Sequence, residues 1–212
     1  MEQNKHHWEN IYHTKNPEER SWTQAIPKTS IKLIQSFHLS KEARIIDVGG
    51  GESNLVDCLV DEGFQNITVL DISESALNKT GKRLGAKADK VNWITGDVNR
   101  YPFTEQFDLW HDRAVFHFMT TKEARAAYRE QVKKAVRPGG ILIIGSFSEN
   151  GPEKCSGLSV QRYNEFSLAR ELSDGFELIQ CLIENHITPF HTSQEFIFCS
   201  FKRTERHVVS QH

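Results

Sequence analysis

The sequence predicts an α/β fold in which a mostly parallel sheet alternates with helices. Short runs of branched apolar residues alternate along the chain with segments whose apolar residues recur at helical spacing, and this order is typical of βα units. The first run, ARIIDVGGG over residues 43–51, ends in three glycines. A buried parallel strand reads this way where the chain turns tightly into a helix. Two apolar runs near the end, without a helix between them, indicate an antiparallel hairpin.

The remaining elements follow from the same patterns. Pro27 is expected to open a helix with Ile31, Ile34 and Phe37 on its apolar face. Ser73 is the expected N-cap of a later helix. We expect further helices at 55–63, 74–84, 122–136 and 163–172, and strands at 43–48, 67–72, 91–97, 107–112, 141–147, 176–184 and 194–203. The alternation in the last strand is typical of an antiparallel edge strand, and residues 137–140 are expected to form a turn.

Length and composition indicate one globular domain. The chain has 212 residues, of which 38% are apolar and 25% charged, so a substantial core is expected. A formal charge of −2 argues against nucleic acid or an acidic membrane surface as a partner. The polar N-terminus is unlike a secretory signal, and no apolar run reaches the ~20 residues that span a bilayer. We therefore expect a cytoplasmic protein, as a monomer or a homodimer.

The four cysteines show no metal-binding or redox spacing. They are Cys58, Cys155, Cys181 and Cys199, and no pair forms a CxxC motif. Three of them lie in apolar runs, where we expect buried thiols. This expectation agrees with a reducing compartment.

Acidic residues stand where successive parallel strands end. Asp47 precedes the glycines, Asp71 ends the second strand and Asp97 ends the third. Ligands of open α/β sheets bind at the carboxyl ends of strands. A dinucleotide loop would need glycine at the position of Asn54, and an acid two residues before the first glycine suits a ligand with a cationic group. Each acid alone could instead be a helix cap.

These segments resemble a known family. IIDVGGGESNL, VLDIS, ITGDV, FDLWHDRAVFHF and RPGGILII resemble the successive motifs of class I S-adenosylmethionine-dependent methyltransferases over residues 43–147, and the closing strands extend the resemblance to 203. It implies a doubly wound, seven-stranded sheet of order 3-2-1-4-5-7-6 with the last strand antiparallel. It also implies one domain over 1–203, with a helical lid (1–40), a cofactor-binding core (41–147), a substrate loop with the closing strands (148–203), and a tail (204–212).

The resemblance also implies where the cofactor lies. The methionine part of S-adenosylmethionine, and of its product S-adenosylhomocysteine, would lie beside Asp47 and the glycines, with the ribose at Asp71 and the adenine at Asp97. Ser53 departs from the family, since many members have a third glycine there. The aromatic residues near the N-terminus could approach the cofactor or simply pack the helix onto the sheet. The residues expected at the cofactor are Trp22, Asp47, Gly49, Gly50, Gly51, Asp71, Ile72, Asp97, Val98 and His111.

Candidates for catalysis and acceptor binding follow the fourth strand and the last loops. We consider His111, Asp112 and His117 as catalytic residues, and expect His111→Ala and His117→Ala to slow transfer while leaving cofactor binding nearly intact. Joint binding of a metal ion by these three residues is disfavoured, because the six-residue separation of the histidines is awkward for ligation of one ion. Each lone histidine could instead be a surface or capping residue, and each arginine part of a structural ion pair. Candidates for the acceptor side are Arg113, Arg162, His186 and His191.

Three functions remain open at this point. The first is methyl transfer to nitrogen, oxygen or sulfur of a small molecule, and the DRA segment (112–114) resembles a piece of thiopurine-type methyltransferases. The second is methylation of a protein, at lysine. The third is a non-catalytic or NAD-binding Rossmann-like protein, against which the missing glycine at Asn54 argues. The lack of NPPY or DPPY after the fourth strand argues against methylation of nucleic-acid bases.

Overall fold

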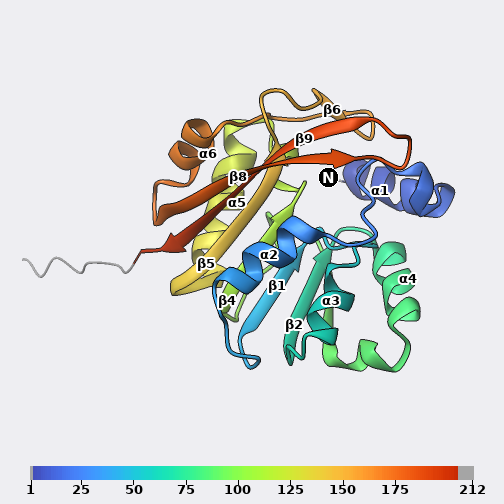
Figure 1. Cartoon of the computed structure of the whole chain (residues 1–212), viewed down its shortest axis with the longest axis horizontal. Helices are drawn as coiled ribbons and strands as arrows, with labels where there is room; N and C mark the ends of the chain where they lie inside the picture. Colours follow the sequence, from blue (N-terminus) through green and yellow to red (C-terminus); the bar gives the residue numbers. More distant parts are fainter. Residues whose placement is uncertain (1, 205–212) are drawn as a thin grey trace, which may run out of the picture.

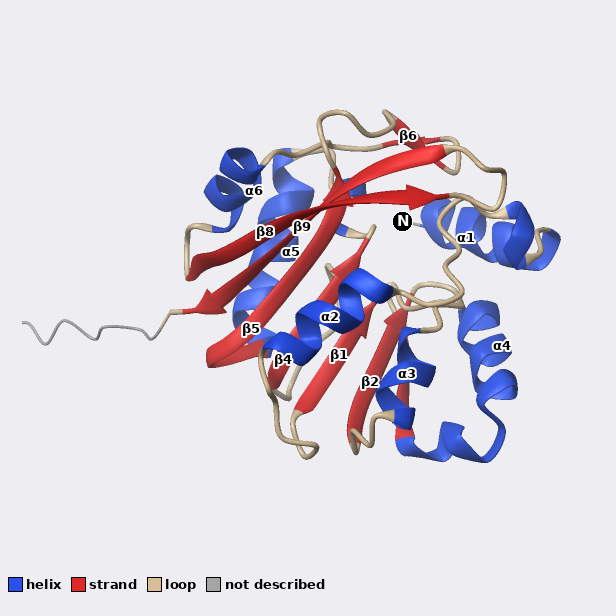
Figure 2. Cartoon of the chain, in the orientation of Figure 1, coloured by secondary structure: helices blue, strands red, loops and turns tan. Residues whose placement is uncertain are grey.

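The computed structural model describes residues 2–204, and a seven-stranded sheet forms its centre (Figures 1 and 2). Its strand order is β3-β2-β1-β4-β5-β9-β8, with β6 and β7 forming a separate small hairpin. Counted without that hairpin, the order is 3-2-1-4-5-7-6, and β9 runs antiparallel to both of its neighbours, which confirms the expected fold. The strands are β1 (Arg44–Val48), β2 (Asn66–Asp71), β3 (Val91–Thr95), β4 (Phe107–Arg113), β5 (Val136–Phe147), β6 (Lys154–Cys155), β7 (Leu158–Ser159), β8 (Phe176–Ile187) and β9 (Ser193–Arg203).

Helices cover both faces of the sheet. The helices are α1 (Glu2–Thr14), α2 (Lys28–Ser36), α3 (Leu55–Asp61), α4 (Glu74–Leu84), α5 (Lys122–Ala135) and α6 (Glu165–Leu172), with short 3-10 turns η1 (Pro17–Glu19), η2 (Gly85–Lys90) and η3 (Phe116–Phe118). Side chains alternate along each strand: Ile45 belongs to the same buried cluster as Leu33 of α2, whereas Ile46 belongs to the cluster that contains Tyr128 of α5. One apolar core therefore lies under α2, α3 and α4, and the other under α5 and α6 (Figure 1).

Helix α1 lies at the carboxyl edge of the sheet, beside α4 (Figure 1). Two oxygens of Glu9 accept backbone N–H groups at the start of α4, at 2.7 Å from Glu74 and 3.4 Å from Ser75. Lys79 of α4 donates to the backbone oxygen of Tyr12. In this way α1 is held over the edge at which β1 and β2 end.

Two local expectations were wrong. Residues 137–140 lie within β5, which follows α5 directly, and Gly139 has the positive φ (+76°) that this passage needs. Strand β9 lies inside the sheet, between β5 and β8. Its residues are buried on both faces from Phe196 to Phe201, because helices and the neighbouring strands cover it. On this side of the sheet the edge strand is β8.

The cysteine expectation was also wrong in part. Cys181 and Cys199 lie opposite each other in β8 and β9, with Cα atoms 4.1 Å apart, and form a disulfide. Cys58 and Cys155 are free thiols. The cytoplasmic location stays a prediction, as does the division into lid, core and closing region, and the expected tail lies outside the described residues except for Thr204. Within residues 2–204, every helix is too short or too polar to cross a membrane.

Candidate active site

Two adjoining cavities open at the carboxyl edge of the sheet. The inner cavity, of about 60 Å³, is lined by the glycine turn after β1, the segment 20–30 and His111 of β4. The outer cavity, of about 230 Å³, lies between the ends of β2 and β3, helix α1 and the segment after β4. Tyr12, Trp22, Gly49 and Arg113 line both cavities, so the two form one continuous cleft.

The glycine turn brings the backbone close to this cleft. Gly49 and Gly51 have φ angles of +69° and +42°, which favour glycine. A Cβ atom on Gly49 would overlap Val115, and one on Gly51 would stand 2.5 Å from the hydroxyl of Tyr12 and 3.0 Å from Oδ2 of Asp71. Glycine is therefore required at both positions, because a side chain would overlap the residues that pack against the turn.

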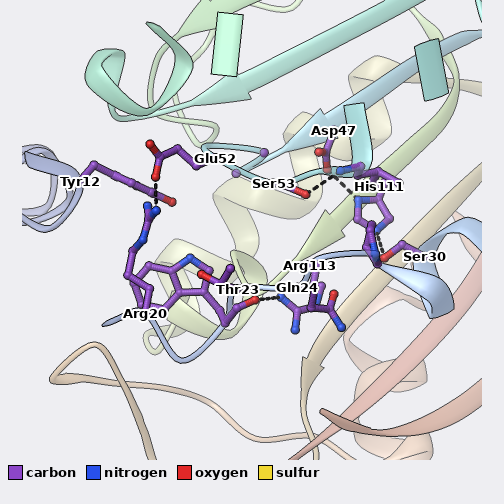
Figure 3. Close-up of a pocket in the computed structure, with 15 residues that line it drawn as sticks. Tyr12, Arg20, Thr23, Gln24, Ser30, Asp47, Glu52, Ser53, His111 and Arg113 are labelled. Atoms are coloured by element: carbon purple, nitrogen blue, oxygen red, sulfur yellow. Dashed lines mark hydrogen bonds and ion pairs between the residues drawn. The ribbon is translucent and has the colours of Figure 1, made fainter. Parts of the chain in front are cut away.

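Asp47 lies at the floor of the inner cavity, next to His111 (Figure 3). Nδ1 of His111 lies 2.7 Å from Oδ1 of Asp47, and Nε2 of the same ring lies 2.8 Å from the hydroxyl of Ser30. All three side chains are buried. Oδ2 of Asp47 has no hydrogen-bond partner among the described residues, so a buried carboxylate oxygen is free to accept from a ligand.

Arg20 provides a cation at the same cavity. It is 2% exposed, forms an ion pair with Glu52 and lies over the ring of Tyr12 at 5.0 Å. Its Nε and Nη1 atoms have no hydrogen-bond partner within residues 2–204. The sequence analysis did not assign a site role to Arg20, Tyr12, Glu52 or Ser30. Tyr12, Arg20 and Ser30 lie in a region without a motif, and Glu52 lies in the glycine motif at a position for which the pattern indicates no role.

Asp71 and Asp97 line the outer cavity together with Ile72 and Val98. Oδ1 of Asp71 accepts the backbone N–H of Ser73 at 2.8 Å, and burial raises the pKa of this carboxyl to about 7. Oδ1 of Asp97 accepts the N–H of Asn99 at 2.9 Å. Each acid thus caps a local turn and also faces the cleft. A capping role and a ligand-binding role are therefore compatible for both residues.

Trp22 likewise both lines the cleft and packs against helix α1. It lines both cavities, and its ring packs edge-on against Trp8 and Tyr12 of α1, with centroids 5.7 Å and 6.4 Å apart. Trp8 in turn contacts Phe118 at 5.2 Å. These aromatic rings form a wall of the cleft that comes from α1, the segment 20–27 and η3.

Asp112 and His117 lie away from the described lining of both cavities. Asp112 projects from the opposite face of β4, where it accepts the backbone N–H groups of Val115 and Phe116 and the hydroxyl of Tyr128. His117 is fully buried between Phe118 and Phe147, and desolvation lowers its pKa to about 3. Neither side chain is placed to touch a ligand in the cleft, and His111, Asp112 and His117 form no metal-binding group within residues 2–204.

The four acceptor-side candidates are dispersed. Arg113 lines the cleft, whereas Arg162 pairs with Glu153 and donates to backbone oxygens of its own loop. His186 is buried and bonded to the backbone oxygen of Ser21 at 2.6 Å, which ties β8 to the segment above the inner cavity. His191 is exposed in the β8–β9 loop. The structure brings only Arg113 of these four to the cavities.

Comparisons with known proteins show that this chain is similar to methyltransferases. A family model for a methyltransferase domain matches residues 45–140. A ubiquinone/menaquinone biosynthesis C-methyltransferase of Roseobacter denitrificans is 33% identical over 110 residues, covering 50% of this chain and 43% of the relative. An EEF1A lysine methyltransferase 2 of Danio rerio is 29% identical over 123 residues, covering 55% of this chain and 53% of the relative. The chain thus spans about half the length of these curated relatives.

The solved structures agree on the fold. The 1,6-didemethyltoxoflavin-N1-methyltransferase of Burkholderia thailandensis, with bound 1,6-didemethyltoxoflavin and S-adenosylhomocysteine, has a TM-score of 0.69 to this chain at 17% identity. The similarity covers 96% of this chain and 85% of that one. At this identity the likeness concerns the fold.

Proposed function

We propose that the chain, which matches a methyltransferase-domain model over residues 45–140, is a class I S-adenosylmethionine-dependent methyltransferase that transfers a methyl group from S-adenosylmethionine to a small molecule. The atom methylated is nitrogen, oxygen or sulfur. One observation carries this proposal: Asp47, Arg20 and Asp71 line one continuous cleft, and both Asp47 and Arg20 have buried polar atoms that lack partners in the described chain.

These residues fit the parts of the cofactor. Oδ2 of Asp47 is a buried acceptor for the ammonium of the methionine part, and Nε and Nη1 of Arg20 are buried donors for its carboxylate. Asp71 suits the two ribose hydroxyls, since a carboxylate can accept both. Asp97, Val98 and Ile72 border the outer cavity where the adenine would lie. The zwitterion would thus find an anion and a cation at opposite sides of the inner cavity.

Methyl transfer requires the chain to position the acceptor against the methyl group and to exclude water. The cofactor supplies a methyl group activated by a positively charged sulfur, so no covalent residue is needed. Gly49 allows close approach at the junction of the cavities, and Trp8 and Trp22 cover the junction from the lid. His111 holds Asp47 by a short hydrogen bond, and we assign it the role of a positioning residue.

A small acceptor fits this site better than a protein side chain. Helix α1 and the segment 20–27 border the cleft, and its outer cavity of about 230 Å³ would hold the ribose and adenine as well as the acceptor, which leaves room for a small molecule. The similarity to a lysine methyltransferase keeps protein methylation as the second candidate. A cytoplasmic location remains part of this proposal.

Calorimetric titration with S-adenosylhomocysteine tests the proposal, with NADH as the control ligand. We expect micromolar binding of the first ligand and none of the second. Asp47→Asn should weaken binding at least about tenfold because a charge-assisted contact is lost. The matched variant Asp61→Asn, on the exposed surface of α3, should bind as wild type does. A folded wild-type protein that ignores S-adenosylhomocysteine would refute the proposal.

A further inference from the structure

Arg113 is a cation in the cleft that forms no ion pair within residues 2–204. It ends β4 and lines both cavities, at the point where they join. Nη1 donates to the backbone oxygen of Trp22 at 3.0 Å, and the guanidinium lies 4.5 Å from the ring centre of Phe196. Nε and Nη2 are buried and have no hydrogen-bond partner within the described chain.

The nearby carboxylates of Glu184 and Asp47 act on Arg113 from beyond ion-pair distance, and each is hydrogen-bonded to another residue. Asp47 is bonded to His111, and Glu184 accepts from the amide of Gln24 at 3.0 Å. Among residues 2–204, no carboxylate lies within ion-pair distance of Arg113, whereas Arg162 has Glu153 as its partner. A buried cation with open donors is unfavourable unless a ligand completes it. An anion that enters the cleft would satisfy these donors and compensate the charge.

The rest of the outer cavity near Arg113 is apolar and aromatic. Trp8, Trp22 and Phe118 line it, with ring centroids 5.2–5.7 Å apart in edge-on contacts. The thiol of Cys155, from the β6–β7 hairpin, lines the same region and is buried. Such walls stabilise a flat apolar body and provide little for a strongly hydrated one.

We propose that the methyl acceptor is a small aromatic or otherwise flat molecule carrying a carboxylate, which Arg113 binds while Trp8, Trp22 and Phe118 enclose the apolar part. This inference rests on the proposed function, since it names the acceptor class of the same cleft. It also disfavours a lysine side chain as acceptor, because an ammonium group would have to be desolvated beside a guanidinium.

Arg20, rather than Arg113, serves the cofactor carboxylate in this assignment. Arg20 lines only the inner cavity, on the side of the glycine turn, whereas Arg113 also borders the aromatic wall. The two arginines should therefore separate in experiment: Arg20→Gln weakens cofactor binding, and Arg113→Gln weakens acceptor binding.

The test uses benzoate as the probe, added to the protein saturated with S-adenosylhomocysteine, with neutral benzamide and cationic benzamidinium for comparison. Tryptophan fluorescence reports binding, because Trp8 and Trp22 line the cavity. We expect benzoate to bind at least about tenfold more tightly than either comparison ligand. Arg113→Gln should remove this preference, Arg113→Lys should retain part of it, and Arg162→Gln should keep it fully.

Three results would overturn the inference. Benzoate binds no better than benzamide, or its preference survives Arg113→Gln, or Arg113→Gln weakens S-adenosylhomocysteine binding by more than about tenfold. In the last case Arg113 serves the cofactor. If the wild-type protein does not bind S-adenosylhomocysteine, the proposed function fails, and the benzoate titration on the free protein still decides whether Arg113 forms an anion site.

Discussion

Asp47 and His111 face each other from neighbouring parallel strands, with Oδ1 and Nδ1 2.7 Å apart beneath helix α2. The register of β1 and β4 makes them direct partners, and alternation places both on the face that α2 covers. Ser30 of α2 contacts the other ring nitrogen. Both nitrogens of His111 are thus engaged, and one oxygen of Asp47 is left for a ligand.

We expect His111→Ala to weaken S-adenosylhomocysteine binding by roughly 5- to 100-fold, because a buried carboxylate oxygen loses its donor. This differs from the expectation drawn from sequence that the variant would leave cofactor binding nearly intact and slow transfer. Ser30→Ala leaves the Asp47 contact in place and should cost less than about threefold. Calorimetry measures both variants. Unchanged affinity with lost turnover in His111→Ala would restore a catalytic role.

The pKa of Asp71 makes cofactor binding depend on pH. Desolvation raises the pKa of this carboxyl to about 7, and the ionised form is the one that accepts from two ribose hydroxyls. Affinity should therefore increase as the pH rises through about 7 and fall about tenfold per pH unit below it. Asp71→Asn should bind more weakly at pH 8 and lose this slope. A wild-type affinity that is flat between pH 5 and 8 would contradict the ribose assignment.

The raised pKa of Asp71 affects folding stability in the opposite direction to cofactor affinity. The unfolded chain ionises Asp71 near its ordinary pKa of 3.8, whereas the folded protein retains the proton until about pH 7. The folded state then binds more protons in this interval, so its stability falls as the pH rises. Without ligand, Asp71→Asn should be more stable than wild type at pH 8 and should lose the difference toward pH 4. Thermal unfolding at both pH values measures this difference in stability. Asp112 is present in both proteins, so its own contribution to the pH dependence cancels in the comparison.

The strand order and the acids at the strand ends could be predicted from the sequence because they rest on local patterns. The direction of side chains could have been predicted further. Leu109 and His111 share one face of β4, and Trp110 and Asp112 share the other, so His111 and Asp112 cannot both face one site. The role of Arg20 could not be predicted, since only the tertiary fold of segment 20–27 carries it to the glycine turn. The Cys181–Cys199 bond required the register of β8 and β9.

Asp112 should matter for stability rather than for chemistry. Its buried carboxylate accepts two backbone N–H groups of the turn that carries Val115, which packs against Gly49. Asp112→Ala leaves those donors and the hydroxyl of Tyr128 unsatisfied, and should lower the free energy of unfolding by about 2–4 kcal/mol. Tyr128→Phe removes one of the contacts and should cost about 1 kcal/mol. Urea unfolding measures both, and an Asp112→Ala protein as stable as wild type would sink this assignment.

Glu9 should control how firmly the lid is held. Burial acts to raise its pKa, but hydrogen bonds from Ser75, Glu74 and Ser73 outweigh this and lower it, so the ionised carboxylate is the form that caps α4. The folded pKa is depressed, and the contact is therefore present at neutral pH and lost as the pH falls through that value. Glu9→Gln should increase amide exchange in α1 and speed release of S-adenosylhomocysteine by roughly two- to fivefold. Glu18→Gln, in the exposed η1 turn, is the matched control and should change neither rate. If exchange in α1 is the same in Glu9→Gln as in wild type, then the aromatic contacts of Trp8 and the Lys79–Tyr12 hydrogen bond hold the lid without Glu9.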